Sequence, residues 1–305
     1  MKDAKTTEAV RTDYHVHPDY SIDAIPVKIR EYCCQAIELR LKEVCFTTHF
    51  ELDPVRRQVN NFVFFNGRKH PADNLVWLDS YFKEIEDARL EFRDIGLEVK
   101  AGIEIGYAPG LERGIESVLE AYPFDFVLGA IHCLDHISIS SKQESARCFA
   151  NHSLHEMRER YFHALREAVQ TGLFDCIAHV DLYRRYGLEH YGPEILTIHR
   201  GVIEPVLEKM ARRGMGLEIN TSSLRRGIEE FHPSREIVSL AVEAGITVFT
   251  VGSDAHRLGE LGEHIDEVLA LLDEFGLCNH IFTKRQAIPG IENGCGTGRQ
   301  AAAGR

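Results

Sequence analysis

The sequence lacks the features of a membrane protein and of a disulfide-stabilised one. No stretch of the 305 residues approaches the roughly 18 consecutive apolar residues of a membrane-spanning helix. The first eleven residues contain no long apolar run, so no secretory signal peptide is expected. The eight cysteines form no CxxC pair, and a chain of this length does not need disulfides to fold. We therefore expect a cytoplasmic protein with reduced thiols.

Basic residues are scarce relative to acidic ones. The chain has 35 Lys and Arg against 47 Asp and Glu, which gives a formal net charge of −12. An acidic surface repels a phosphate backbone, so nucleic-acid binding is not expected. A small anionic substrate stays compatible with this charge, because metal ions and arginines can dominate the field of a single site.

Strand and helix patterns alternate along the chain. Seven apolar runs predict strands near residues 12–17, 43–49, 97–106, 124–132, 174–180, 216–220 and 247–254. The helical stretches between them, one of which has Gly214 as a plausible C-cap, predict a parallel sheet with helices outside. We expect segment 1–11 to precede a single α/β domain, a distorted (βα)7 TIM-like barrel over residues 12–289. The run NHIFTKR near its end is a candidate final strand.

Two segments interrupt or follow this pattern. Residues 53–76 are polar, contain VNNFVFF and NGRKHP, and carry few helix signals. Long irregular connections in compact domains are usually functional or disordered. We expect this insertion to be a lid over the catalytic face, with a mobile surface insertion as the alternative. Residues 290–305 are rich in Gly and Ala and are expected to be disordered.

Residue types that bind metals stand at the ends of the predicted strands. In a parallel β/α barrel these ends lie on one face, where the chemistry occurs. Residues i and i+2 of a strand point the same way, so His15 and His17 project together, as do Asp254 and His256. Imidazoles and carboxylates without thiolate suit Zn, Mn or Fe. Nine candidates suit two or three divalent ions rather than one: His15, His17, Asp23, His49, Glu104, His132, His179, Asp254 and His256.

At these motifs the sequence resembles the PHP-domain (polymerase and histidinol phosphatase) family. The likeness rests on HVH with Asp23, then TTHFE, AGIEIGY, GAIHCLD, AHVDL and SDAH, and runs from about residue 12 to 288. Two strings favour the histidinol-phosphatase branch, namely EINTSSLRRG and SDAHRLGELG. The resemblance implies the PHP barrel and metal-dependent hydrolysis of a phosphomonoester, with L-histidinol phosphate of histidine biosynthesis as the favoured substrate.

The same resemblance implies three ion sites. The first would be formed by His15, His17, Glu104 and Asp254, and the second by Glu104, His132 and His179. The third would be formed by Asp23, His49 and His256. The catalytic role falls to His15, His17, Glu104, Asp254 and His256.

Several side chains beyond the strand ends could hold a phosphate. Arginine suits this task because its planar guanidinium makes two parallel hydrogen bonds to a phosphate. The candidates are Arg184, Arg185, Asn220, Arg225, Arg226 and Arg257. The sequence leaves open which of them does so, and it leaves the oligomeric state open.

The sequence is compatible with four other functions. The first is hydrolysis of another small phosphate ester. The second is a PHP-type nuclease, against which the net charge and the absence of a basic, aromatic-interleaved stripe count. The third is a non-catalytic metal-binding domain, which the complete ligand set disfavours. The fourth is a metal-dependent amidohydrolase, which fits Glu104 and the SDAH string less well.

Overall fold

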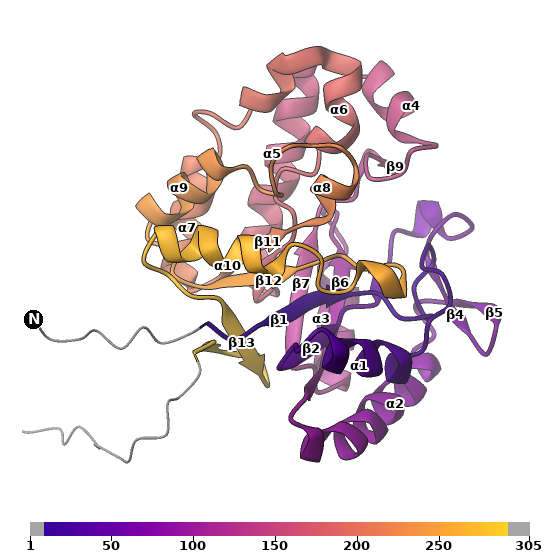
Figure 1. Ribbon diagram of the computed structural model, residues 1–305. Helices are drawn as coiled ribbons and strands as arrows, with labels where there is room; N and C mark the ends of the chain where they lie inside the picture. Colours follow the sequence, from indigo (N-terminus) through magenta and orange to yellow (C-terminus); the bar gives the residue numbers. More distant parts are fainter. Residues whose placement is uncertain (1–8, 292–305) are drawn as a thin grey trace, which may run out of the picture.

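Seven parallel strands form the centre of the molecule (Figure 1). The computed structural model describes residues 9–291. The strands are β1 (Thr12–Val16), β2 (Glu43–Phe46), β6 (Glu98–Gly106), β7 (Phe126–Ala130), β10 (Cys176–Ile177), β11 (Gly216–Asn220) and β12 (Phe249–Gly252), and they neighbour one another in this order. This confirms the predicted (βα)7-type barrel. The short β3 (His49–Glu51) continues from β2 and pairs with β6.

The barrel closes where the first and last strands meet. Val16 forms a parallel bridge with Ala255, the His17 amide donates to the Ala255 carbonyl at 2.9 Å, and the Ala255 amide donates to the His15 carbonyl at 3.2 Å. Figure 1 shows β1 running beside β12 at this seam. The predicted sheet is therefore a nearly closed ring rather than an open one.

Helices surround the strands (Figure 1). They bury apolar residues against the outer face of the sheet, as amphipathic crossover helices do. They are α1 (Ile29–Glu38), α2 (Val76–Phe92), α3 (Glu112–Ala121), α4 (Ser145–Ala150), α5 (Leu154–Thr171), α6 (Arg184–Tyr191), α7 (Glu204–Arg213), α8 (Ser222–Arg225), α9 (Arg235–Glu243) and α10 (Ile265–Glu274). Short 3₁₀ turns are η1 (Pro54–Arg56), η2 (Arg93–Ile95), η3 (Gly192–Thr197) and η4 (Leu258–Glu260). None of the helices within residues 9–291 is both long and apolar enough to cross a membrane.

Sequence signals set several of these helix ends. Ser153 and Glu156 form a capping box at the start of α5, in which each side chain bonds the other residue's backbone amide. Gly214 ends α7 with a left-handed φ of 66°, as its sequence position predicts.

The insertion at 53–76 contains a β-hairpin, formed by β4 (Phe62–Phe65) and β5 (Arg68–Pro71). Asn66 and Gly67 both have positive φ, of 52° and 71°, as a tight hairpin turn requires. A second short hairpin, β8 (Cys133–Leu134) with β9 (Ile137–Ser138), follows β7. The lid role of the insertion stays a prediction.

The run NHIFTKR forms β13 (His280–Thr283), but this strand pairs with β14 (Gln286–Pro289) outside the barrel sheet. Phe282 fills the floor of the barrel against Tyr14 and Phe126, with ring centroids 6.1 and 4.7 Å away. The expected disorder of 290–305 falls outside the described residues, apart from Gly290 and Ile291.

Candidate active site and metal centre

All nine predicted ligands gather at the C-terminal end of the strands. They come from β1 and the loop after it, from β3 and β6, and from the segments after β7, β10 and β12, at sequence positions up to 241 residues apart, the separation of His15 and His256. Among the described residues, three overlapping groups place one ligand atom per residue within 4.8 Å of one another: His17, His49 and His256; His15, His17 and Glu104; and His49, Glu104 and His132.

In the first proposed ion group, each of two imidazoles lies close to two carboxylates. His15 Nε2 lies 3.4 Å from Glu104 Oε2 and 3.6 Å from Asp254 Oδ1. His17 Nε2 lies 3.6 and 3.3 Å from the same two oxygens. Ligands about 2.0–2.1 Å from a tetrahedral ion are separated from one another by about 3.4 Å. The four imidazole–carboxylate distances are close to this separation, and His15, His17 and Glu104 form one group that could hold an ion.

A second group of atoms surrounds the other oxygen of Glu104. Its Oε1 lies 3.1 Å from His132 Nε2 and 3.0 Å from His179 Nε2. One carboxylate thus faces two groups of imidazoles, the arrangement that a bridging ligand needs. His179 has a positive φ of 23° and follows the end of β10 at Ile177, so a local turn, and not strand alternation, sets its direction.

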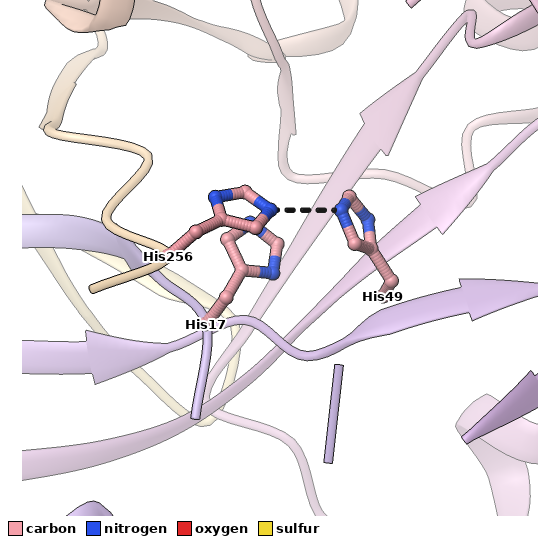
Figure 2. Close-up of side chains that lie close together, drawn as sticks. All are labelled: His17, His49 and His256. Atoms are coloured by element: carbon pink, nitrogen blue, oxygen red, sulfur yellow. Dashed lines mark hydrogen bonds between the residues drawn. The ribbon is translucent and has the colours of Figure 1, made fainter. Parts of the chain in front are cut away.

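The third group lies nearer the surface. Asp23 Oδ1 is 3.4 Å from His49 Nε2 and 3.2 Å from His256 Nε2. The two imidazole nitrogens approach within 3.4 Å, and Figure 2 shows them pointing toward each other beside the ring of His17. The rings of His17 and His256 stack with centroids 4.1 Å apart. His15 and His17 thus lie together in one group, whereas Asp254 and His256 lie in adjoining groups.

Unpartnered buried atoms fit divalent metal ions. His15 Nε2, His17 Nε2 and Glu104 Oε2 are buried and have no hydrogen-bond partner. The opposite nitrogens are occupied, because His15 Nδ1 contacts Glu218 at 2.5 Å and His17 Nδ1 contacts Ser21 Oγ at 3.0 Å. An imidazole that donates from Nδ1 offers a lone pair at Nε2. A cation would satisfy all three of these atoms.

The electrostatics of the cluster also favour bound cations. Burial raises the pKa of Glu104, but the nearby His49, His15 and His132 outweigh burial and hold the pKa well below its usual range. Burial lowers the pKa of His132, yet Glu104 and Glu51 raise it to about 10. The carboxylates therefore attract positive charge, which metal ions provide in place of protons.

A cleft of about 560 Å³ opens above these ligands. Its wall includes Asp23, His49, His132, His179, Asp254 and His256, whereas His15, His17 and Glu104 lie buried beneath. The rim carries Arg56 and Asn60 from the insertion and residues 140–144 from the connection after β9. The insertion therefore borders the cleft that the ligands face.

The candidate phosphate-binding residues separate into two sets. Arg185, Arg226 and Arg257 line the cleft. Arg184 points elsewhere, into ion pairs with Asp181 at 2.9 Å and Glu230 at 2.7 Å.

Arg225 and Asn220 likewise do not line the cleft, because other residues hold their side chains. Arg225 donates to the Ser253 carbonyl at 2.6 Å and pairs with Glu263 at 2.9 Å. Asn220 is buried, and its side chain forms hydrogen bonds with the side chains of Ser222 and Glu218. Arg185, Arg226 and Arg257 are thus better placed than Arg184 or Arg225 to meet a phosphate.

Sequence reasoning missed two buried glutamates behind the ligands. Glu51 contacts His132 Nδ1 at 2.7 Å, and Glu218 contacts His15 Nδ1. The period-two pattern could have found both, since Glu51 follows His49 by two residues and Glu218 precedes Asn220 by two. Which histidine each contacts depends on neighbouring strands and was not predictable locally.

A parallel seven-stranded β/α barrel with histidine and carboxylate clusters at its strand ends defines a metal-binding barrel of the hydrolase type. The family model described as "PHP domain" matches residues 13–222, more than half of the chain. The protein belongs to the PHP domain family.

Curated relatives cover most of the chain. A probable histidinol-phosphatase of Deinococcus radiodurans is 29% identical over 264 residues, which span 85% of this chain and 92% of the relative. The histidinol-phosphatase of Lactococcus lactis is 26% identical over 247 residues, or 81% of this chain and 84% of the relative.

Solved structures share the fold. The crystal structure of histidinol phosphate phosphatase from Lactococcus lactis, complexed with zinc, L-histidinol and phosphate, superposes with a TM-score of 0.73 at 22% identity. The superposition covers 91% of this chain and 98% of that one. A putative histidinol phosphatase from Listeria monocytogenes has a TM-score of 0.69 at 20% identity and covers 84% and 99%.

Proposed function

We propose that this protein is a metal-dependent phosphomonoesterase that hydrolyses L-histidinol phosphate to L-histidinol and phosphate in histidine biosynthesis. The proposal rests on one arrangement. Glu104 is shared between two ligand groups, and these groups lie beneath a cleft that three arginines line. Relatives named histidinol-phosphatase match over most of their own length, which supports the choice of substrate.

Three ions would be held by the three ligand groups. His15, His17, Glu104 and Asp254 would hold the first, Glu104, His132 and His179 the second, and Asp23, His49 and His256 the third. The histidine and carboxylate ligands admit Zn, Mn or Fe. When bound, such ions lower the pKa of a water molecule and neutralise charge on phosphoryl oxygens.

The chain itself binds and orients the substrate. Arg185 is fixed by Ser222 at 3.2 Å and Asp254 at 3.4 Å, so its guanidinium is held beside the ligand groups. Arg226 and Arg257 would complete the phosphate site from the same wall of the cleft. A guanidinium fixed before substrate arrives needs no reorganisation during the reaction.

The remainder of the cleft suits a small polar leaving group. Glu144, Asn60, Ser140 and Gln143 line the side formed by the insertion and the connection after β9. Acidic and neutral polar groups accept hydrogen bonds from a cationic amine or an imidazole, as L-histidinol carries. The net charge of −12 opposes a nucleic-acid substrate. A cytoplasmic location agrees with the seven free cysteines of residues 9–291.

Phosphate release from a panel of esters tests this function. Zn²⁺-loaded and Mn²⁺-loaded protein would be assayed for phosphate release from L-histidinol phosphate and from other small phosphate monoesters, and for strand cleavage of single-stranded DNA. We expect the highest kcat/KM on L-histidinol phosphate and its loss in chelator. Turnover of another monoester alone would overturn the substrate, and turnover of DNA alone would overturn the reaction class.

A further inference from the structure

Two glutamates outside the ligand set hold the far ring nitrogens of two ligand histidines. Glu51 Oε1 lies 2.7 Å from His132 Nδ1, and Glu218 Oε1 lies 2.5 Å from His15 Nδ1. In both histidines the opposite nitrogen, Nε2, faces Glu104, at 3.1 and 3.4 Å. A neutral imidazole has one N–H group, so a carboxylate that accepts the Nδ1 hydrogen directs the Nε2 lone pair toward an ion.

Each glutamate occupies space that a glycine on a neighbouring strand leaves free. A Cβ at Gly106 would lie 2.2–2.4 Å from three atoms of the Glu51 carboxyl group. A Cβ at Gly252 would lie 2.3 Å from Glu218 Oε1 and 2.4 Å from His15 Cβ. Neither glycine has a positive φ, so the backbone conformation does not require glycine at these positions. Glycine is required here because any larger side chain would occupy the space of the glutamate carboxylate.

Glu218 has further contacts that fix its position. Its Oε2 accepts the His179 amide at 3.0 Å and the Asn220 side-chain amide at 3.2 Å. Glu218 therefore contacts one candidate ligand in each of two proposed ion groups. It contacts His15 through the imidazole and His179 through the backbone amide. Glu218 is fully buried, so water cannot replace its hydrogen bond to His15.

We propose that Glu51 and Glu218 are positioning residues that set metal affinity, and that Gly106 and Gly252 make room for them. Glu51 fixes His132 for the ion shared with Glu104 and His179. Glu218 fixes His15 for the ion shared with His17 and Asp254. The inference rests on the proposed metal site, and it assigns a task to four residues outside the ligand set.

Zn²⁺ titration of metal-free protein tests the role of the glutamates. Loss of an outer-shell partner costs about 10–100-fold in metal affinity. We expect Glu51→Ala to weaken one ion by about that factor and leave the others unchanged, with a smaller loss for Glu51→Gln, which keeps the acceptor oxygen and shape. Glu218→Gln should weaken a different ion, so the double variant should weaken two. Glu43→Gln, a buried glutamate at the opposite end of the barrel, is the matched control and should bind Zn²⁺ as wild type does.

Gly106→Ala provides a test that a general structural role would not pass. The added methyl group displaces the Glu51 carboxylate, so we expect about 10-fold weaker Zn²⁺ binding in the wild-type background. In the Glu51→Ala background the space is empty, and Gly106→Ala should add no further loss. Gly129→Ala, whose Cβ would instead meet the Phe174 ring at 2.5–2.8 Å, should lower thermal stability without changing Zn²⁺ affinity.

The outcomes separate this inference from the proposed function. Wild-type protein that binds no Zn²⁺ would defeat the metal site itself. Wild-type binding with unchanged affinity in Glu51→Ala and Gly106→Ala would overturn only the positioning role. An equal loss for Gly106→Ala with and without Glu51 would also overturn it, because the effect would then come from the strand. Circular dichroism of each metal-free variant confirms that the comparison is between folded proteins.

Discussion

At the scale of single residues, Glu104 connects more of the site than any other described side chain. One oxygen faces His132 and His179, while the other faces His15, His17 and His49. The carboxylate is fully buried and ionised among imidazoles. Without the negative charge of Glu104, the positive charge of metal ions in two groups would be less neutralised.

Glu104→Gln is therefore expected to lose at least two metal equivalents. Its kcat/KM should fall by more than about 100-fold, since loss of an outer-shell partner alone costs 10–100-fold in affinity or activity. Elemental analysis of the purified variant and steady-state kinetics measure both effects. Glu43→Gln is the control for a buried glutamate in a barrel strand. Full metal content in Glu104→Gln would contradict a bridging role.

Arg185→Lys isolates the phosphate contact from metal binding. Lysine keeps the positive charge but loses the planar pair of donors, so kcat/KM should fall by about 10–100-fold while metal content stays at the wild-type level. The control is Arg212→Lys, an exposed arginine of α7 paired with Glu208. Wild-type kcat/KM in Arg185→Lys would assign the phosphate to Arg226 or Arg257.

At the scale of elements, two connections form the outer wall of the cleft. Arg56 of η1 donates to the His136 carbonyl at 2.8 Å and pairs with Glu144 at 2.6 Å. His136 in turn contacts Asp53 at 2.6 Å. These contacts hold the start of the insertion to the turn between β8 and β9 and to the segment that follows β9, so both connections form this wall of the cleft.

Breaking this connection should affect substrate binding more than chemistry. We expect Arg56→Ala to raise KM by about 10-fold, with a smaller change in kcat and no change in metal content, because it touches none of the nine ligands. Removing one partner of a partly buried ion pair should also lower the free energy of unfolding by about 1–3 kcal/mol. Kinetics with metal analysis measure the first effect, and Arg57→Ala, which is exposed, is the control. A fall in kcat alone would place Arg56 in a different role.

The sequence predicts elements well where a local signal determines them. The seven strands and the C-cap at Gly214 follow from apolar runs and from glycine at a helix end. The hairpin of residues 62–71 was missed although FVFF followed by Asn-Gly is a hairpin signal.

Properties that depend on distant residues were not predictable. The pairing of Glu51 with His132 depends on neighbouring strands, and the diversion of Arg184 depends in part on Glu230, 46 residues away in the sequence. Single-sequence patterns carry no information about such partners, because the partners meet only in the folded barrel.

At the scale of the whole molecule, the two ends of the barrel differ in chemistry. The C-terminal end gathers the ligands, whereas the opposite end is closed by Phe282 and by a buried group in which the Tyr14 hydroxyl donates to Glu43, with Lys100 3.7 Å away. Burial raises the pKa of Glu43 to about 7. This carboxyl group should therefore affect stability without affecting the active site.

Glu43 gives the folding stability a dependence on pH. Between about pH 4.5 and 7 the folded state holds a proton on Glu43 that the unfolded chain has released, so the free energy of unfolding falls as pH rises through this range. The fall amounts to at most about 3 kcal/mol for this group. Denaturant unfolding at pH 5 and pH 8 in chelator should show a smaller pH difference for Glu43→Gln than for wild type. Identical pH differences would show that Glu43 titrates normally.

The seam between β1 and β12 has a consequence for how the protein matures during synthesis. His15 and His17 emerge from the ribosome early, but Asp254 and His256 emerge only near the end of translation, and the two sets meet across this seam. A nascent chain that stops before residue 249 lacks the last barrel strand and Asp254, one of the two carboxylates of the first ion group. Metal capture at the proposed first group would therefore be a final event, and truncated products would carry an incomplete centre.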